Sequence, residues 1–365
     1  MRDYIYLLMT DKRSGVVASI LKFFLFLFSL LYILGLKVVF TLRLLRTAHL
    51  HLDAKVISVG NLTTGGTGKT PLVEMIANFL LEKGKKVVVL TRGYKLLSKE
   101  KSDKALQPFL YEEIGDEPAL LRKNLPRATI LVGAGRVKNA RLAIRSYSAD
   151  TLILDDGFQY RQLARDIDIL VIDATNPFGN GRLLPRGILR EPIAGLVRAD
   201  AVVITKIDAA SPGQVNTVKA RIKSQNPGAI IACAVHKPSR VLDFNESILQ
   251  PAWLQAREFI AVCAIGDPQY FINTLKSAGA VIKDSVFFED NHPYSLKDLI
   301  DIADRCQKAS IKKVITTEKD MIKIKPALDR HQLTFKGYGL EFFALGIELD
   351  IVENKDEFLR RLLGK

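Results

Sequence analysis

The sequence has few cysteines and no low-complexity tract. Among its 365 residues, the three cysteines (Cys233, Cys263 and Cys306) are far apart, and none has the C-x-x-C or His-Cys spacing of a zinc site. A structural zinc centre and a disulfide framework are therefore excluded, and buried, reduced thiols in a reducing cytosol are the remaining interpretation. Because 48% of the residues are hydrophobic and 25% charged, the chain is globular and not disordered.

Acidic residues are scarce relative to basic ones. The formal net charge is +14 and the pI is about 9.6, which implies an acidic partner: nucleic acid, anionic lipid headgroups or a phosphorylated substrate. In the first 50 residues the only acids are Asp3 and Asp11, and this basic region surrounds the most apolar part of the chain. That combination favours a membrane surface, and we expect no nucleic-acid partner.

This apolar part is uncharged only from Phe23 to Leu36, which is shorter than the ~20 residues that span a bilayer. A longer spanning helix over residues 16–40 requires Lys22 and Lys37 to snorkel to the interface. No small-x-small cleavage site follows, which argues against a secretory signal peptide. A buried core helix is the other alternative. We predict an uncleaved helix lying in the cytoplasmic leaflet.

Beyond this segment, short apolar runs alternate with stretches long enough to form helices. The runs in the first part of the chain are KVISVGN, KKVVVLTRG, ATILVG, DTLILDDG, DILVIDA and ADAVVITKID. This alternation predicts an α/β fold in which a doubly wound parallel sheet is covered on both faces. Length favours two domains. We expect an N-terminal membrane-associated helical segment (1–50), a P-loop domain (51–235) and a smaller C-terminal α/β domain (236–365).

The C-terminal domain has a second set of runs, REFIAVCAIG, GAVIKDSVFF, KKVITTEKD and EFFALGIELDI. Helices are predicted near Pro268–Ala278 and Leu296–Ala309. Between the two domains, the stretch HKPSRVLDFNESILQPAW is expected to be irregular or edge structure that contains the crossover.

The strand KVISVG is followed directly by a glycine-rich turn and an amphipathic helix. Glycines in such a turn let backbone N–H groups approach phosphate oxygens, and the helix N-terminus adds a favourable dipole. The strict P-loop pattern has glycine where Thr63 stands, so this is a variant loop that retains the G-K-[ST] end. We expect Lys69 to neutralise phosphate charge and Thr70 to ligate Mg²⁺. The predicted nucleotide-binding residues are Thr63, Thr64, Gly65, Gly66, Thr67, Gly68, Lys69 and Thr70.

Carboxylates follow a neighbouring predicted strand and begin a predicted helix. Asp155 and Asp156 come after LIL and before Gly157, a position suited to Mg²⁺ in a P-loop protein. Asp116 and Glu117 precede Pro118 at a predicted helix start. They are equally compatible with a helix cap and with a site in which Asp116 accepts the proton of an acceptor hydroxyl.

Several predicted loops combine arginine with glycine or proline. Guanidinium groups suit anionic phosphates, and these loops follow strand ends, where ligands bind in open α/β sheets. Each of these arginines is also compatible with a solvated surface charge. The candidates are Arg92, Arg136, Arg182, Arg186 and Arg190.

Taken together, VGNLTTGGTGKTP, TRGY, GDEPALL, LDDGFQYR, LLPRGILREP, VVITKID, FEDNHPY and VITTEKD resemble the tetraacyldisaccharide 4'-kinase family of the lipid A pathway. The resemblance covers the chain in order from about Val59 to Asp320. It implies an ATP- and Mg²⁺-dependent kinase that phosphorylates the 4'-hydroxyl of a tetraacylated glucosamine disaccharide 1-phosphate. It also implies a location at the cytoplasmic face of the inner membrane, with the active site between two α/β domains. Apart from the resemblance, we expect the chain to be a monomer.

Carried over residue by residue, the resemblance makes Asp116 the catalytic base and Lys69 and Thr70 the phosphate and Mg²⁺ contacts. Further metal-organising carboxylates are Glu117, Asp155 and Asp156, and Arg190 is a transition-state or phosphate contact.

The chain departs from the family pattern at three places. The family's Asp-His is replaced by Asp290 and Asn291, so the role of that histidine either shifts to His292 or is absent. Tyr160 replaces a histidine after DDGFQ, and Lys95 replaces a glycine after TRGY.

The alternative function is a P-loop ATPase switch of the protein-partitioning or targeting type. Such switches carry a lysine before the first glycine of the loop, where this chain has Thr64. A nucleic-acid-binding ATPase is a third alternative, which explains the net charge but not the apolar N-terminal segment.

Overall fold

The computed structural model describes residues 2–46, 50–93, 114–330 and 338–364. A single twelve-stranded sheet runs through the protein in the order β10-β9-β11-β12-β7-β6-β5-β1-β4-β2-β3, with β8 paired to β7. The strands are β1 (Lys55–Asn61), β2 (Val87–Thr91), β3 (Thr129–Val132), β4 (Thr151–Asp155), β5 (Ile167–Asp173), β6 (Ala201–Thr205), β7 (Ile230–Asp243), β8 (Ile248–Leu249), β9 (Glu258–Cys263), β10 (Val281–Phe287), β11 (Lys313–Thr317) and β12 (Glu341–Glu353).

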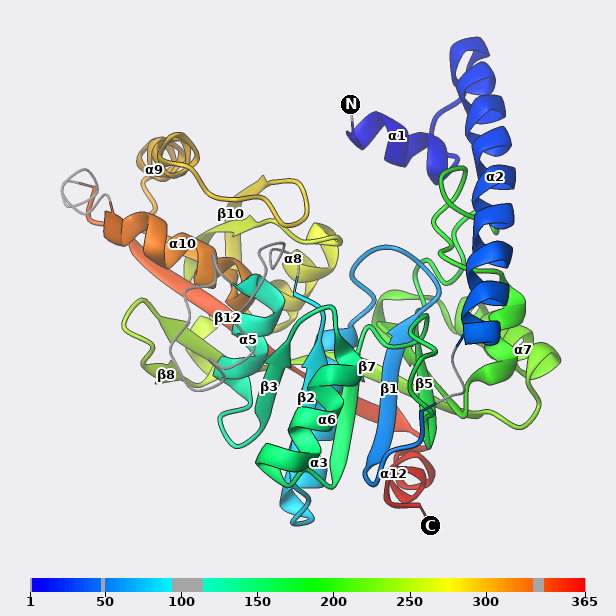
Figure 1. Cartoon of the computed structure of the whole chain (residues 1–365). Coiled ribbons are helices and arrows are strands. Elements are labelled where there is room, and N and C mark those ends of the chain that lie inside the picture. The colour runs from blue at the N-terminus through cyan, green and yellow to red at the C-terminus, as the bar shows by residue number, and fades with distance from the viewer. Residues whose placement is uncertain (1, 47–49, 94–113, 331–337, 365) are drawn as a thin grey trace.

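Helices connect and cover these strands (Figure 1). They are α1 (Arg2–Met9), α2 (Val16–Arg46), α3 (Lys69–Glu82), α5 (Asp116–Asn124), α6 (Arg136–Tyr147), α7 (Pro212–Gln225), α8 (Pro268–Ser277), α9 (Leu296–Ala309), α10 (Glu318–Arg330) and α12 (Lys355–Leu363), with short 3₁₀ helices at Ile193–Arg198, Ile207–Ala209 and Pro251–Leu254.

The larger half of the sheet, from β6 to β3, is entirely parallel. Its strands are apolar on both faces because helices cover both sides. In β1, Ile57 and Val59 pack with α3, α5 and α12, whereas Val56 points to the opposite face, which α6 covers. Helix α7 covers that opposite face over β5 and β6. The predicted doubly wound α/β architecture is confirmed.

The smaller half contains β10, β9, β11 and β12, which pair in parallel. Helices α9 and α10 pack on one face and α8 packs on the other, so this half has two apolar layers of its own. Local sequence sets the helix starts. Ser295 forms a capping box with Asp298 at the start of α9, and the side chain of Asp267 caps α8 immediately before Pro268.

Strands β7 and β12 belong to both halves. The first residues of β7 pair with β6, and the rest of the strand pairs antiparallel with β12, which crosses from the smaller half toward α12 (Figure 1). The expectation of irregular or edge structure after Val235 is met only in part: residues 236–243 continue β7 and are not irregular, whereas among the described strands residues 236–240 pair with β12 alone. Pro238, which cannot donate to a ladder, is tolerated because the register shifts there, between Gly346 and Ile347.

The N-terminal helix is longer than its uncharged run. Helix α2 projects beyond the sheet domain at one side of the molecule (Figure 1), and residues Val16–Val38 have the length and mean hydropathy (2.4) of a membrane span. Only 11% of the span's most apolar window is buried, so α2 is not a core helix. Lys22, one of the charges that close the uncharged run, is paired with Asp11 at 2.7 Å.

One narrow stripe of α2 contacts the body. Ser29 is buried and donates its hydroxyl to the carbonyl of Leu183 (2.6 Å), and the hydroxyl of Tyr32 donates to the carbonyl of Arg190 (2.8 Å). The remaining surface is exposed and apolar. It includes Val16, Val17, Ile20, Phe23, Phe24, Leu27, Phe28, Leu31, Leu34 and Val38.

Candidate active site

The predicted phosphate loop connects the carboxyl end of β1 to the first turn of α3. Lys69 is the first residue of α3, and its ammonium donates to the side-chain oxygen of Asn61 at the end of β1 (3.1 Å). The amide of Asn61 donates in turn to the carbonyl of Thr63 (2.7 Å) and to the hydroxyl of Thr67 (3.2 Å). One asparagine therefore fixes both ends of the loop and the lysine that follows it.

Gly68, the last glycine of the loop, cannot be replaced by a larger residue without strain. Gly68 has φ +86°, and a Cβ at this position would lie 2.8 Å from Nε2 of His236, so both backbone and space demand glycine. His236 is buried, and this burial lowers its pKa to about 4, which keeps the imidazole neutral. Thr205 supports the same turn through a hydrogen bond from its hydroxyl to the carbonyl of Thr67 (2.8 Å).

The first part of the predicted loop is hydrogen-bonded to the neighbouring segment, residues 188–190. The N–H of Thr64 donates to the carbonyl of Ile188 (2.8 Å), and Thr63 forms an antiparallel bridge with Leu189. The N–H of Thr64 is therefore committed within the protein, whereas Lys69 and Thr70 lie at the helix N-terminus where a phosphate would be held. The neighbouring segment ends at Arg190.

The two aspartates after β4 have different surroundings. Both carboxylate oxygens of Asp156 accept from one guanidinium nitrogen of Arg190, Nη1 (2.9 and 3.0 Å), and Oδ1 lies 3.6 Å from the ammonium of Lys69. Burial opposes its charge, but Lys69 and Arg190 outweigh burial and lower its pKa. Asp155 is buried and accepts from Thr91 (2.9 Å), and burial raises its pKa to about 6.

The arginines predicted as phosphate ligands separate into four groups. Arg190 alone among them contacts a predicted site carboxylate through its side chain. Arg136 is buried and donates to the main-chain carbonyls after β4, so it holds the strand end in place. Arg186 pairs with Asp11 (2.7 Å), and Arg182 lies over the ring of Phe26, so both attach the N-terminal helices to the body. Arg92 is exposed.

Asp116 lies at the N-terminus of α5, facing α10 of the smaller half. Its Oδ1 accepts from the N–H of Glu117 (3.0 Å), and its Oδ2 lies 3.8 Å from the ammonium groups of both Lys319 and Lys323. Lys319 also donates to Glu117 (3.3 Å) and lies 4.0 Å from Asp290. The pair therefore begins a helix and also faces opposite charges on α10, and the role of Asp116 as a proton acceptor stays a prediction.

Electrostatics join this group to the phosphate side. After burial, the charge on Glu117 is the largest contribution that raises the pKa of Asp155. Burial also raises the pKa of Asp290, and both Glu117 and Asp116 add to it while Lys319 opposes it. Carboxylates from both halves thus influence one another across the space between β4 and α10.

The structure does not bring His292 to Asp116. Its Nε2 lies 3.0 Å from Oδ2 of Asp298 at the start of α9, and its ring stacks on Phe288 with centroids 4.6 Å apart. Asn291 occupies the left-handed region with φ +64° and forms a turn against Ala264. A catalytic role for His292 therefore stays a prediction. Lys95 lies outside the described residues.

Several residues at the site were missed by sequence reasoning. Asn61 was seen only as the end of a strand, and Gln159, which donates to the carbonyl of Asn61 (2.9 Å) and to buried Glu191 (2.9 Å), was given no role. Lys319 and Lys323 lie in VITTEKD and just beyond it. The strand-end position of Asn61 was a usable signal, whereas nothing local marks the two lysines as partners of Asp116.

The donor set fits Mg²⁺ held jointly with a nucleotide. Among the described residues no group of three His, Cys, Asp or Glu side chains forms a ready metal cage. Mg²⁺ commonly takes one or two carboxylates and fills its remaining positions with water and phosphate oxygens. Asp155, whose charge is incompletely compensated, and the hydroxyl of Thr70 suit that arrangement better than Asp156, which Arg190 and Lys69 already neutralise.

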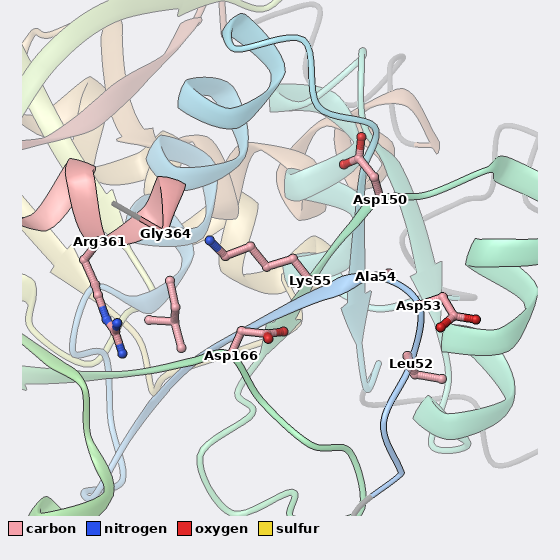
Figure 2. Close-up of a pocket in the computed structure, with 9 residues that line it drawn as sticks. Leu52, Asp53, Ala54, Lys55, Asp150, Asp166, Arg361 and Gly364 are labelled. Atoms are coloured by element: carbon pink, nitrogen blue, oxygen red, sulfur yellow. The ribbon is translucent and has the colours of Figure 1, made fainter.

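A hollow of about 530 Å³ lies at the other end of the strands, away from the phosphate loop (Figure 2). It is lined by residues at the amino ends of strands, including Lys55, Asp150 and Asp166. Their polar groups hold the backbone: Lys55 donates to the carbonyl of Leu362 (2.7 Å), and Asp166 accepts from the N–H of Val56 (2.7 Å). Ligands of open α/β sheets bind at the carboxyl ends, so this hollow is not the candidate active site.

The fold and the site define a P-loop phosphotransferase: a doubly wound sheet whose first strand leads into a glycine-rich loop, a lysine and a helix N-terminus, with aspartates after the adjacent strand. The comparisons with known proteins agree. Residues 21–365 match the family model described as tetraacyldisaccharide-1-P 4'-kinase, LpxK. The chain belongs to this kinase family.

Two relatives named tetraacyldisaccharide 4'-kinase illustrate the similarity. The protein from Halothermothrix orenii is 34% identical over 96% of this chain and 94% of its own length. The protein from Anaeromyxobacter dehalogenans is 39% identical over 75% of this chain and 74% of its own length. Among solved structures, LpxK from Aquifex aeolicus in complex with ATP has a TM-score of 0.70 and 30% identity, covering 94% of this chain and 99% of that one.

Proposed function

We propose that this chain transfers the γ-phosphate of ATP to the 4'-hydroxyl of a tetraacylated glucosamine disaccharide 1-phosphate, at the cytoplasmic face of the inner membrane. The observation that carries the proposal is the arrangement around β1 and β4. Lys69 and Arg190 converge on Asp156, and Glu117, which follows Asp116 at the start of α5, is close enough to raise the pKa of Asp155. The names of the relatives support this substrate class.

On the donor side, the triphosphate binds against the loop and the N-terminus of α3. Lys69 approaches the β- and γ-phosphates, because its ammonium is already oriented by Asn61 and Asp156. Arg190 supplies a second cation beside the γ-phosphate, where negative charge is spread over oxygens in the transition state. The ATP complex of the Aquifex aeolicus protein supports ATP as the donor.

On the acceptor side, Asp116 is the base. Its Oδ1 is held by the N–H of Glu117, so Oδ2 is the oxygen that accepts the proton of the 4'-hydroxyl. The hydroxyl oxygen then forms a bond to the γ-phosphorus while the bond from that phosphorus to the β,γ-bridging oxygen breaks. The products are ADP and the 4'-phosphorylated lipid, and Asp116 releases its proton to solvent.

Mg²⁺, held by Thr70 and by Asp155, Asp156 or Glu117 together with phosphate oxygens, supplies charge neutralisation for the phosphates when bound. The incompletely compensated Asp155 favours that carboxylate as the direct ligand. Asp156 then acts through its contacts with Lys69 and Arg190 and keeps both cations in place.

The exposed apolar surface of the N-terminal helix α2 is an argument for a lipid substrate. This surface suits the acyl region of a bilayer, and the docked stripe of α2 contacts the segment that ends at Arg190. A membrane-embedded acceptor and the site are thereby kept at one surface. We propose that the chain acts as a monomer and that Leu31 and Leu34 are among the residues that enter the membrane.

Mass spectrometry tests the reaction directly. Purified protein in mixed micelles is incubated with Mg²⁺-ATP and the disaccharide 1-phosphate, and the lipid is expected to gain one phosphate. ATP turnover is measured in parallel with and without the lipid. A kinase needs the acceptor, whereas a P-loop switch hydrolyses ATP at the same rate without it. Acceptor-independent turnover with unmodified lipid would refute the proposal.

A further inference from the structure

Helix α10 of the smaller half places two lysines one turn apart against the proposed base. Lys319 is 18% exposed and Lys323 only 4%, and the ammonium of each lies 3.8 Å from Oδ2 of Asp116 on α5. Helix α10 is fixed at its start because Asp320, which is fully buried, accepts from the N–H of Ala264 (3.0 Å) and from Thr317 (2.8 Å). The lysines are therefore presented from a rigid element.

The contact between Asp116 and the two lysines is unusual for an ion pair because Oδ2 of Asp116, which is buried, accepts no hydrogen bond from the described residues. The buried ammonium of Lys323 likewise has no hydrogen-bond partner among them, although it lies 3.0 Å from Oδ1 of Asp320 in an ion pair. Buried polar atoms without partners are uncommon in native proteins, and those that occur are frequent at functional sites. Two opposite charges 3.8 Å apart attract each other strongly in a buried setting while leaving the lone pairs of the carboxylate oxygen unused.

The two carboxylate oxygens of Asp116 therefore have different surroundings. Its Oδ1 is committed to the N–H of Glu117, and its Oδ2 is oriented by two cations that do not occupy it. Other charges nearby do not duplicate this arrangement, because Glu117 and Asp290 carry the same sign as Asp116 and are themselves held by Lys319. Without the lysines, three carboxylates would repel one another around the acceptor hydroxyl.

We propose that Lys319 and Lys323 are positioning residues for Asp116, which hold its Oδ2 toward the acceptor hydroxyl and make the base competent only when α10 is docked on α5. The inference rests on the proposed function and adds to it the dependence of the base on the smaller half. It differs from a role in ATP binding, which would place the lysines against the phosphate loop. Their described ion pairs are all with carboxylates of the acceptor side and with Asp320.

The test is a comparison of lysine variants on the same helix. Lys319→Met is expected to lower kcat for lipid phosphorylation by about 10- to 100-fold while KM for ATP changes less than about threefold, because a misplaced base costs rate without weakening nucleotide binding. Lys319→Arg, which keeps the charge, should restore a substantial part of the rate. Lys325→Met removes another lysine of α10, which pairs with Glu246 at the surface, and should match the wild type.

A double-mutant cycle separates positioning from a purely structural role. In an Asp116→Ala background, Lys319→Met should change the residual rate less than about twofold, because the lysine acts through a carboxylate that is no longer present. Thermal unfolding of every variant is measured beside the rates. Should Lys319→Met fail to fold, Lys319→Gln takes its place in the same cycle.

Each outcome has one meaning. A wild-type rate in Lys319→Met, a loss that persists in full in the Asp116→Ala background, or an increase in KM for ATP at unchanged kcat would overturn the inference while leaving the kinase function intact. A wild-type protein that transfers no phosphate to the lipid would refute the proposed function, and the inference with it.

Discussion

The donor side and the acceptor side of the candidate site are built in different ways. The donor side is formed largely by consecutive residues after β1 and by Asp155 and Asp156 after the adjacent strand, and its charges are closely paired. The acceptor side is formed by Asp116 on α5 and by lysines on α10, more than 200 positions away in the chain, and Oδ2 of Asp116 faces both lysines at 3.8 Å without a hydrogen bond to either.

This difference indicates that the donor side is rigid by itself, whereas the acceptor side depends on how the two halves are docked. A loop between a buried strand and a helix keeps its geometry through local bonds, such as those of Asn61. A site shared between two halves keeps its geometry only while the halves are docked. We therefore expect variants of the donor side to affect ATP binding and rate together, and variants of the acceptor side to affect rate alone.

The largest effect is expected for Asp116. Replacing Asp116 by Ala should slow lipid phosphorylation by about 10²- to 10⁴-fold, the range of general base catalysis, while ATP affinity stays nearly unchanged. Steady-state rates and equilibrium binding of ATP measure the two quantities separately. Asp329→Ala, at the far end of α10, serves as a control. A near-wild-type rate in Asp116→Ala would show that another group accepts the proton.

Lys69 should behave differently. Lys69→Met is expected to reduce kcat by about 10²- to 10³-fold and also to weaken ATP binding, because the ammonium contacts phosphate in both the ground state and the transition state. The same two measurements apply. If the variant bound ATP as tightly as the wild type, Lys69 would point away from the nucleotide and the contrast between the two sides would be lost.

A smaller effect, several-fold, is expected at helix α2, where its two surfaces can be separated. Replacing exposed Leu31 and Leu34 by Ser should weaken partition into vesicles, as should deletion of residues 1–36. Tyr32→Phe removes the hydrogen bond to Arg190 and should lower kcat about two- to fivefold with partition unchanged. Unaltered partition of both the Ser variant and the deletion would rule out α2 as the membrane contact.

The smallest effect on activity is expected for the polar network that joins the two halves. In this network Arg240 donates to both Glu318 (2.8 Å) and Asn124 (2.9 Å), and Asn124 donates to Glu74 (3.0 Å). Burial raises the pKa of Glu74 to about 7 from 4.5. Between these pH values the folded state binds more protons than the unfolded state, so stability falls as pH rises and the loss is complete above about pH 7.

Glu74→Gln removes this titration. The variant should gain stability over the wild type by on the order of 1–3 kcal/mol between pH 5 and pH 8. Denaturant unfolding at the two pH values measures the difference, with Glu82→Gln at the end of α3 as a control. An equal difference at both values would mean that Glu74 does not titrate in the folded protein.

The sequence was most informative where function and local structure coincide. The strand, glycine turn and helix around Lys69 were predicted from adjacent residues, because the phosphate site is a backbone feature of that short segment. The alternating apolar runs predicted the doubly wound sheet, since strands buried on both faces must be apolar throughout. The segment after Val235 was expected to be irregular or edge structure, whereas pairing with β12 extends β7 through a bulge.

The arginines show why the rest was not predictable. Arg136, Arg186 and Arg190 each lie near glycine or proline in the sequence, yet the first holds a strand end, the second attaches the N-terminal helices and the third contacts Asp156. His292 was considered as a catalytic group on sequence grounds, but in the structure it lies against Asp298. The role of a charged side chain depends on what lies within a few ångströms, which only the folded chain defines.

By itself, the sequence determined the nucleotide-binding loop, the parallel sheet, the apolar N-terminal helix and the kinase family, because each depends on neighbouring residues or on a periodic pattern. Only the tertiary structure decided that one sheet joins both halves, that α2 docks along a narrow stripe, and that two lysines of α10 face Asp116. These features depend on contacts between residues distant in the chain, and no local pattern encodes which distant charges will meet.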